Sequence, residues 1–285
     1  MNWVRQWRAC VRVVLFLLWT SIALPIYFLT SFIGGPLHFR WGSFWCSGVC
    51  RILGLHIRFS GTPVGGGPIP TLYVVNHVSY LDILLVYARI PAVFIAKTEV
   101  AGWPLFGLLG RLSNTMFIRR RPLDALIQRN ELARRLNEGQ HVVLFAEGTS
   151  SIGSTVLPFK SSLFSVAEPG ICARPIQIQP LSLTVTRHPD GRPMSEEDLP
   201  RYAWYGDADF LPHMARMLSW SGAVIELACQ EPVQSETVVS RKVLTRDLHR
   251  RIRQAVESRR RLIERELESP ALEADQAAAL SPQDA

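Results

Sequence analysis

Residues 74–82 read VVNHVSYLD, in which His77 follows an apolar run and Asp82 comes five positions later. A histidine held by a carboxylate is a common general base. The two side chains would lie about 16 Å apart in a strand and about 140° apart around a helix, so neither regular structure pairs them. They meet only if the chain turns between them, with His77 in a loop after a strand and Asp82 in the first turn of a helix. From this segment alone, an ordinary loop histidine beside an acidic helix start is the favoured interpretation, because His-x4-Asp is short and common by chance, and the turn that would pair the two side chains is the alternative.

Charged and polar side chains follow two further apolar runs. Residues 114–121 read NTMFIRRR, and residues 144–151 read LFAEGTSS. The residues that would stand just after these two strands are Arg119, Arg120, Arg121, Glu147 and Gly148. Ligands bind at the carboxyl ends of the strands in parallel sheets, so these side chains are candidates for a binding site. For the arginines on either side of Arg120, a solvated charge run is an equally good interpretation.

Short β-rich runs alternate with helical patterns along most of the chain. The β-rich runs cover residues 71–75, 92–96, 114–118, 141–145, 176–186 and 223–229. Residues 122–137 have the apolar period of a helix, with Pro122 in the first turn and Gly139 just past the end. Residues 240–267 form an arginine-rich helical pattern that fits a helix docked on the domain surface. This order predicts an α/β fold with a mainly parallel sheet flanked by helices.

The amino-terminal part of the chain is unusually apolar. Residues 13–34 carry no charged side chain, and a stretch of about 20 apolar residues can cross a bilayer core. A cleaved signal peptide is the alternative, but this stretch is long and no small-x-small site closes it. Residues 41–57 are also mostly apolar, too short to span comfortably, and rich in Trp, which prefers the membrane interface. Because the arginines before residue 13 hold that end in the cytoplasm, we expect a membrane-embedded helical hairpin that dips into the cytoplasmic leaflet.

Composition narrows the classes of partner. The chain has 285 residues, of which 48% are hydrophobic and 19% charged, and its net charge is +7. A basic chain suits an anionic partner, either acidic phospholipid or nucleic acid, but no nucleic-acid-binding motif is present. The five cysteines lack the spacing of a disulfide framework, which fits a reducing compartment. Cys46 and Cys50 lack histidines at zinc-site spacing, so we expect no metal site.

Four ordered blocks resemble the glycerolipid acyltransferase family, which includes the bacterial 1-acylglycerol-3-phosphate acyltransferases. The blocks are NHVSYLD for NHxxxxD, FIRR for FIxR, FAEGTS for FPEGTR, and the apolar IQIQPLSL around Pro180, all between residues 70 and 185. The resemblance implies transfer of an acyl chain from an acyl thioester, on acyl carrier protein or coenzyme A, to a lysolipid hydroxyl, with no cofactor. In this reaction His77 would be the general base, and Asp82 would fix its tautomer and stabilise the imidazolium.

The resemblance also implies a substrate-binding set. The guanidinium of Arg120 suits an anionic group, the third block can bond a head group, and Lys97 resembles a position near the site. The candidate substrate-binding residues are Arg120, Glu147, Gly148, Thr149, Ser150 and Lys97.

Two departures from the family pattern concern the acceptor. Ala146 stands where the family has Pro, and Ser150 stands where it has the Arg of FPEGTR, which removes a phosphate-binding group. The downstream stretches LPFKSSLF, GRPM and AWYGD resemble the lyso-ornithine lipid acyltransferases, whose acceptor carries no phosphate. We therefore expect a membrane-bound lyso-ornithine lipid O-acyltransferase of membrane lipid biosynthesis, with a 1-acyl-sn-glycerol-3-phosphate O-acyltransferase that makes phosphatidic acid as the alternative.

The expected organisation has three parts, with a membrane anchor at residues 1–57, an acyltransferase domain at 58–268 and a disordered tail at 269–285. The expected location is the inner membrane of the cell, with the active site on the cytoplasmic side. A serine hydrolase is a competing class, but the chain has no G-x-S-x-G elbow. A basic, membrane-attached binding protein is the non-enzyme alternative, and it would have no need of His77.

Overall fold

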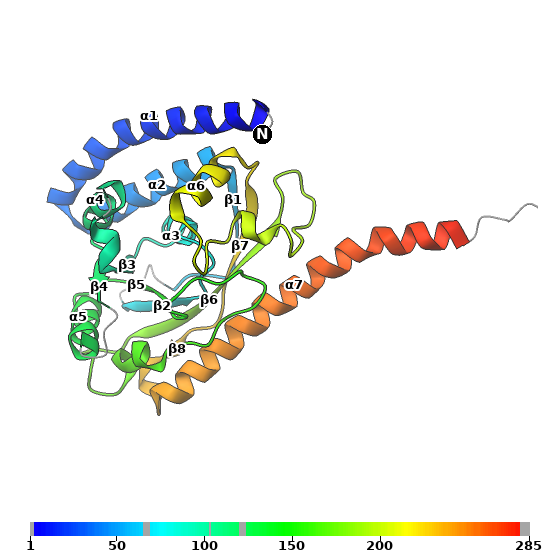
Figure 1. Cartoon of the computed structure of the whole chain (residues 1–285). Coiled ribbons are helices and arrows are strands. Elements are labelled where there is room, and N and C mark those ends of the chain that lie inside the picture. The colour runs from blue at the N-terminus through cyan, green and yellow to red at the C-terminus, as the bar shows by residue number, and fades with distance from the viewer. Residues whose placement is uncertain (1–2, 65–68, 103, 120–123, 280–285) are drawn as a thin grey trace, which may run out of the picture.

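The computed structural model describes residues 3–64, 69–102, 104–119 and 124–279. In this part of the chain, an eight-stranded sheet has the order β1-β7-β6-β2-β5-β3-β4, and β8 pairs with β6 (Figure 1). Neighbouring strands are parallel except where β6 meets β7 and β8. The predicted α/β fold, with a mainly parallel sheet and flanking helices, is therefore confirmed.

The elements follow the alternation seen in the sequence. The strands are β1 Leu55–Ser60, β2 Thr71–Val75, β3 Val93–Lys97, β4 Met116–Ile118, β5 Val142–Phe145, β6 Gln177–Arg187, β7 Ala223–Cys229 and β8 Val233–Gln234. The α-helices are α1 Trp3–Ile33, α2 Gly35–Leu53, α3 Leu81–Tyr87, α4 Pro104–Leu112, α5 Ala125–Asn137, α6 Phe210–Ser219 and α7 Arg241–Ala279. Short 3₁₀ helices are η1 Thr98–Gly102, η3 Ser161–Ala167, η4 Leu199–Arg201 and η5 Ser235–Thr237.

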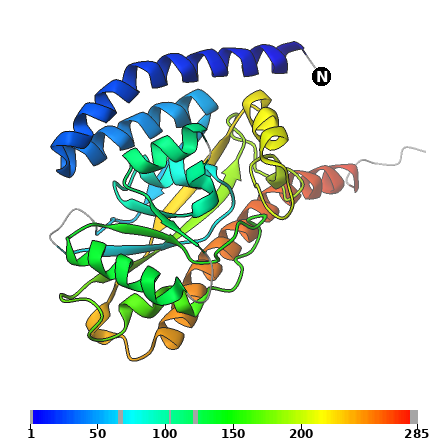
Figure 2. The same ribbon diagram turned by 60° about the vertical axis from the view of Figure 1, so that its left-hand side comes forward.

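The central strand β2 separates two hydrophobic cores. Tyr73 and Val75 belong to the core that includes α2 and α3, whereas Leu72 and Val74 belong to the core that includes α5 and α7. Figures 1 and 2 show the α1–α2 pair on one face of the sheet and α5 and α7 on the other. Because helices cover both faces, β2 and β5 are buried along their whole length and are mainly apolar instead of alternating with polar residues.

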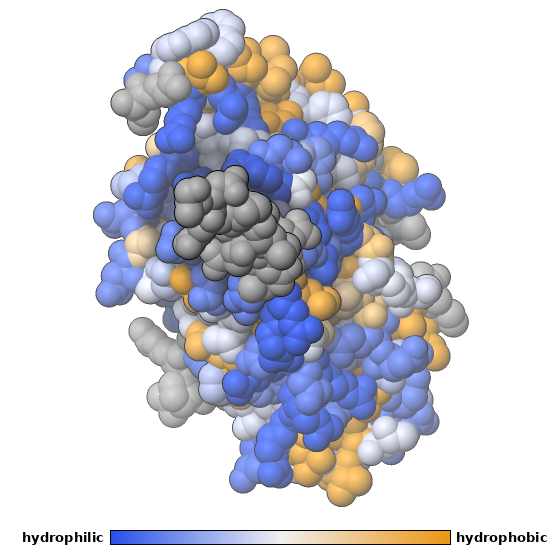
Figure 3. Space-filling model, turned by 90° about the vertical axis from the view of Figure 1, so that its right-hand side faces the viewer, coloured by the Kyte–Doolittle hydropathy of each residue, from blue (hydrophilic) through white to orange (hydrophobic). Residues whose placement is uncertain are grey.

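Helices α1 and α2 form the expected hairpin. Gly34 and Gly35 have φ angles of 65° and 64°, which glycine adopts at little cost, and they make the tight turn between the helices. Helix α1 is long and apolar enough to cross a membrane by length and composition, and only 22% of its most apolar stretch is buried. Figure 3 shows hydrophobic residues gathered at the top of the molecule, where α1 lies, on an otherwise largely hydrophilic surface.

The domain side of α1 is fastened by Arg12. Its guanidinium donates to the backbone carbonyls of Leu218, Trp220 and Ser221, at the carboxyl end of α6. These carbonyls carry partial negative charge at a helix end, so a cation is a favourable partner there. As a result, α1 lies along the domain instead of standing away from it.

Two expected boundaries differ from the structure. The apolar hairpin ends at Leu53, before the expected residue 57, because Gly54 takes a left-handed conformation (φ 73°) and the chain enters β1. The tail was expected to be disordered from residue 269, whereas α7 continues as a helix to Ala279, and residues 280–285 lie outside the described part. Residues 271–279 are rich in Ala, and an existing helix extends through such residues without a new nucleation step.

Candidate active site

His77 and Asp82 meet at the carboxyl end of β2. The strand ends at Val75, and α3 begins at Leu81, so the chain turns between the two residues as the sequence predicted. His77 Nδ1 lies 2.8 Å from Asp82 Oδ2. The carboxylate acceptor fixes the proton of a neutral imidazole on Nδ1, which leaves Nε2 as the atom able to accept a proton.

The ring of His77 is held but remains accessible. It stacks on Phe145, with ring centroids 4.2 Å apart and planes inclined by 18°. The His77 side chain is 18% exposed, whereas that of Asp82 is fully buried. Among the described residues, none hydrogen-bonds to Nε2, so this atom is available to a bound molecule.

Asp82 is surrounded by donors besides the imidazole. The backbone N–H groups of Val78 and Ser79 donate to Oδ2 at 2.7 and 2.9 Å. The hydroxyl of Tyr202 donates to Oδ1 at 2.7 Å. Tyr202 is 120 residues from Asp82 and just precedes the AWYGD stretch, so only its position beside a motif could have drawn attention to it. Sequence reasoning missed it because no local pattern links the two residues.

The side chain of Glu147 binds the backbone of His77 and of a neighbouring loop. Its Oε1 accepts the backbone N–H of His77 at 2.6 Å, and its Oε2 accepts that of Leu157 at 2.8 Å. Burial, together with a smaller effect of the nearby Asp82 carboxylate, raises the pKa of Glu147 to about 7, against the opposing effect of the backbone N–H donors. The expected bond from Glu147 to a head group remains a prediction, and these contacts point instead to a role in placing the catalytic loop.

The three residues after Glu147 differ in environment. Gly148 has a φ of 72°, a conformation that favours glycine, and a Cβ atom there would lie 3.0 Å from the flexible end of the Lys160 side chain. Thr149 is exposed. Ser150 is half-buried, and its hydroxyl donates to the backbone carbonyl of Trp204. Thr149 alone of these has a side chain open to solvent.

Cations line the same edge of the sheet on the far side of β5. Lys97 ends β3 and is exposed, and it is in register with Ile118 of β4. Arg119 follows Ile118 directly and is exposed as well. Arg120 and Arg121 lie outside the described residues. The carboxyl edge of the parallel strands therefore carries His77 at β2 and positive charge at β3 and β4.

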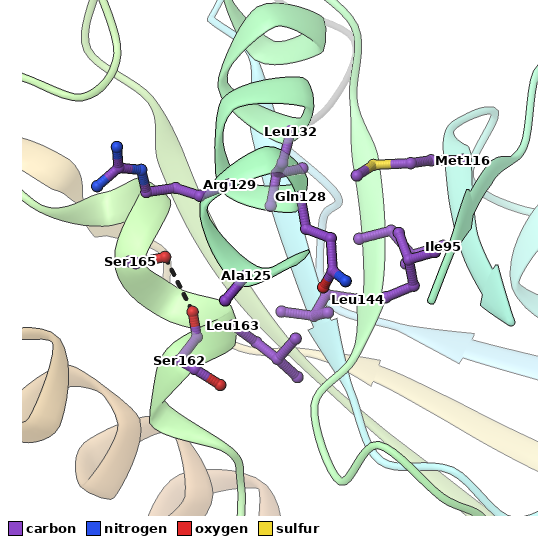
Figure 4. Close-up of a pocket in the computed structure, with 11 residues that line it drawn as sticks. Ile95, Met116, Ala125, Gln128, Arg129, Leu132, Leu144, Ser162, Leu163 and Ser165 are labelled. Carbon is purple, nitrogen blue, oxygen red and sulfur yellow. Dashed lines mark hydrogen bonds between the residues drawn. The ribbon is translucent and has the colours of Figure 1, made fainter. Parts of the chain in front are cut away.

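A small cavity lies on the opposite face of the sheet from the hairpin (Figure 4). Its volume is about 40 Å³, and its walls include Ile95, Met116 and Leu144 from the sheet, Leu132 from α5 and Leu163 from η3. Neither His77 nor Asp82 lines it. A cavity of this size holds little more than one water molecule, so it is too small to be assigned to a lipid chain. No group of three or more potential metal ligands occurs in the described ranges.

Comparisons with known proteins identify the family of the chain. Residues 66–184 match the Acyltransferase family. The chain is 33% identical over 265 residues to a lyso-ornithine lipid O-acyltransferase of Rhizobium meliloti, covering 91% of this chain and 88% of that protein. It is 37% identical over 216 residues to a protein of the same description from Brucella abortus, covering 74% and 79%.

Other similarities point to neighbouring activities and to the fold. A 1-acyl-sn-glycerol-3-phosphate acyltransferase of Neisseria gonorrhoeae is 39% identical over 108 residues, which are 38% of this chain and 42% of that protein. The crystal structure of the 1-acyl-sn-glycerophosphate acyltransferase of Thermotoga maritima superposes with a TM-score of 0.66 at 18% identity. It covers 89% of this chain and 97% of that chain, and at this identity the likeness shows the fold alone.

The raised pKa of Glu147 predicts a pH-dependent contribution to stability. A free Glu titrates near pH 4.5 and the folded one near 7, so between these values the unfolded chain holds fewer protons than the native protein. The contribution of Glu147 is therefore full below pH 4.5 and is lost as the pH rises to about 7. We expect the melting temperature of Glu147→Gln, relative to wild type, to increase across this range in detergent solution. Glu236→Gln, at an exposed site, is the control, and parallel wild-type and Glu147→Gln curves would refute the assignment.

Proposed function

The chain belongs to the glycerolipid acyltransferase family and is a lysolipid O-acyltransferase, and from this premise we propose that it acylates lyso-ornithine lipid at a membrane. The observation that carries the proposal is the extent of similarity. Relatives described as lyso-ornithine lipid O-acyltransferases match most of the chain. The match to the 1-acyl-sn-glycerol-3-phosphate acyltransferase of Neisseria gonorrhoeae covers only 38% of it. The activity belongs to membrane lipid biosynthesis.

In the proposed mechanism, His77 acts as the general base. Its Nε2 takes the proton of the acceptor hydroxyl while the hydroxyl oxygen forms a bond to the thioester carbonyl carbon. The carbon–sulfur bond then breaks, and the imidazolium returns the proton to the departing thiolate. Asp82 holds the imidazole in the reactive tautomer and stabilises the imidazolium, so no covalent acyl-enzyme is needed. The donor is an acyl thioester carried by acyl carrier protein or coenzyme A.

The acceptor proposal also draws on Ser150. In place of the family's arginine, a small hydroxyl donates to the Trp204 carbonyl and so links two loops of this chain. A phosphomonoester carries close to two negative charges and would lose one charge-assisted bond here, whereas an aminoacyl head group has a single carboxylate. Lys97 and Arg119 can supply a cation for that carboxylate. The same two cations favour the second candidate, a lysophosphatidate acyltransferase, because they suit a phosphate as well.

Membrane attachment is proposed from the hairpin. Its apolar surface faces away from the domain, with Trp7, Leu17, Ile22 and Phe32 all more than half exposed. Arg12 ties the amino-terminal half of α1 to the domain, so we propose that α1 lies within one leaflet and that the domain stays on the cytoplasmic side of the inner membrane. Acyl thioester donors are soluble in the cytoplasm, which suits that side.

Loss of the base should stop the reaction without unfolding the protein. We expect His77→Ala to lower acyl transfer by roughly 10² to 10⁴, the usual contribution of a general base, and Asp82→Asn to lose much of the activity. The assay follows labelled acyl thioester with purified protein, and the melting temperature reports folding. His249→Ala, a change of the same kind on α7, is the control. Acyl transfer by His77→Ala at the wild-type rate would show that His77 is not the general base.

Acceptor choice is tested by competition between lyso-ornithine lipid and lysophosphatidate, offered together to the purified protein. We expect wild type to prefer lyso-ornithine lipid, and Ser150→Arg to shift the preference toward lysophosphatidate about tenfold or more, since a charge-assisted bond contributes about 1.5 to 3 kcal/mol. Ser150→Ala is the matched control, because it also removes the bond to Trp204 but adds no charge. A wild-type preference for lysophosphatidate would favour the second candidate function.

Attachment through the hairpin predicts a protein that resists extraction by salt. Apolar burial is not screened by ions, so the full chain should stay in the membrane fraction in 1 M salt, where the screening length is about 3 Å. A carboxyl-terminal alkaline phosphatase fusion should be inactive, because that enzyme needs the periplasm. An active fusion would place the domain on the other side of the membrane.

A further inference from the structure

Two features that the proposed mechanism does not use carry inferences. The first is Tyr202, which lies beyond the stretch that matches the family, residues 66–184. We propose that Tyr202 is a positioning residue that acts through Asp82 to set the base strength of His77. The inference rests on the catalytic roles proposed for His77 and Asp82.

The contact of Tyr202 completes the bonding of the carboxylate. Tyr202 is fully buried, and its hydroxyl occupies Oδ1, whereas Oδ2 accepts from His77 and from two backbone N–H groups. A donor on Oδ1 draws negative charge away from the oxygen that faces the imidazole. It also prevents the carboxylate from rotating, since both oxygens are bonded. Burial raises the pKa of Tyr202, so the hydroxyl keeps its proton and remains a donor.

The backbone around Tyr202 is tied to the catalytic loop. Trp204 N–H donates to the carbonyl of Val78 at 3.0 Å, and the Trp204 carbonyl accepts the hydroxyl of Ser150. Tyr202 itself follows the 3₁₀ turn η4 and donates its N–H to Leu199 at 2.9 Å. Backbone hydrogen bonds therefore hold the chain both before and after Tyr202, and this fixes the position of the phenol beside Asp82.

Removal of this donor changes a pH profile as well as a rate. Without it, more charge stays on Oδ2, and the imidazolium is bound more tightly. A larger fraction of the base is then protonated, so the acidic limb of kcat/KM moves to higher pH, which loss of packing alone would not cause.

The test compares Tyr202→Phe, which keeps the ring, with Tyr87→Phe. Tyr87 is also a buried tyrosine, but its hydroxyl bonds to that of Tyr27 and not to the site. We expect Tyr202→Phe to lower kcat/KM about tenfold, the effect of one bond to a charged group, and to shift the acidic limb upward. Tyr87→Phe should leave the limb unmoved.

A double-mutant cycle separates this inference from the proposed mechanism. If Tyr202 acts through Asp82, Tyr202→Phe should add little further loss in an Asp82→Asn background. Fully additive losses, or an acidic limb that does not move, would overturn the role of Tyr202. Full activity of His77→Ala would instead overturn the mechanism on which the inference rests.

The second feature is the positive charge of the first 81 residues, which include the hairpin. Residues 1–81 contain six arginines and no Asp or Glu, so they hold +6 of the chain's net charge of +7. At the carboxyl end of α2, a cavity of about 190 Å³ is lined by Arg51, His56, Arg89 and Ser47 among others. Arg51 and Arg89 therefore line the same cavity, together with Cys50. In the described part of the chain, neither forms an ion pair with a carboxylate.

We propose that this cavity binds a phosphate-bearing anion, namely the head group of an anionic phospholipid. The choice of a lipid rests on the proposed attachment through α1. A helix at the interface lies about 5 to 10 Å into the boundary between head groups and acyl chains. Helix α2 packs against α1, and the axes of packed helices usually lie about 8 to 10 Å apart. We infer from this that Arg51, near the carboxyl end of α2, lies close to the level of the lipid phosphates.

The test titrates the purified full chain in detergent with dihexanoyl phosphatidylglycerol, dihexanoyl phosphatidylcholine and inorganic phosphate by calorimetry. We expect phosphatidylglycerol to bind and phosphatidylcholine not to bind. Arg51→Gln with Arg89→Gln should weaken binding tenfold or more, because each charge-assisted bond is worth at least that factor. Arg58→Gln, on β1 but outside the lining, is the matched control.

Three outcomes would overturn this second proposal. They are equal binding of both lipids, unchanged binding by the double variant, and binding of inorganic phosphate alone. The last outcome would assign the cavity to free phosphate. Failure of membrane attachment itself would appear separately, as release of the chain from membranes by salt.

Discussion

The buried carboxylate of Asp82 is the interaction on which the rest of the site depends. A carboxylate removed from water costs several kcal/mol unless its oxygens are bonded, and here four donors bond them. Two are backbone N–H groups of the loop, one is His77 and one is Tyr202. The carboxylate can be buried only when this loop is turned and the segment around residue 202 is docked. The requirement that fixes the imidazole therefore also holds distant parts of the chain together.

A second buried carboxylate, Glu147, supports the first from the other side of the histidine. Strands β2 and β5 are parallel neighbours, so their carboxyl ends deliver the His77 loop and Glu147 to the same place. Asp82 binds the histidine side chain, and Glu147 binds the histidine backbone. Burial, and to a lesser degree the nearby Asp82 carboxylate, raises the pKa of Glu147 to about 7, so this carboxyl group is partly protonated near neutral pH. Ring orientation and backbone position are thus set by different groups.

The two faces of the sheet have different surroundings. One face is covered by α5 and α7, whose exposed arginines are largely paired with carboxylates, such as Arg253 with Glu257. The other face is covered by the hairpin, which combines exposed apolar residues with arginines that, among the described residues, form no ion pair with a carboxylate. Apolar burial and attraction to anionic head groups act together at a lipid surface, and this combination suits an enzyme whose acceptor is itself a lipid.

The sequence determined the fold class and the pairing of His77 with Asp82, because these depend on short-range patterns. Apolar runs alternating with helical periods specify parallel strands, and His77 and Asp82 lie within one turn of chain. Features that depend on contacts between distant parts of the chain were decided only by the tertiary structure. The bond of Tyr202 to Asp82 joins residues 120 positions apart, and the end of the hairpin at Leu53 depends on the pairing of β1 with β7. The side chain of Glu147 accepts the backbone N–H groups of His77 and Leu157, and no local sequence pattern predicts these contacts. Local periodicity reports which face of an element is buried, but partners across the sheet are fixed only when the strands pack.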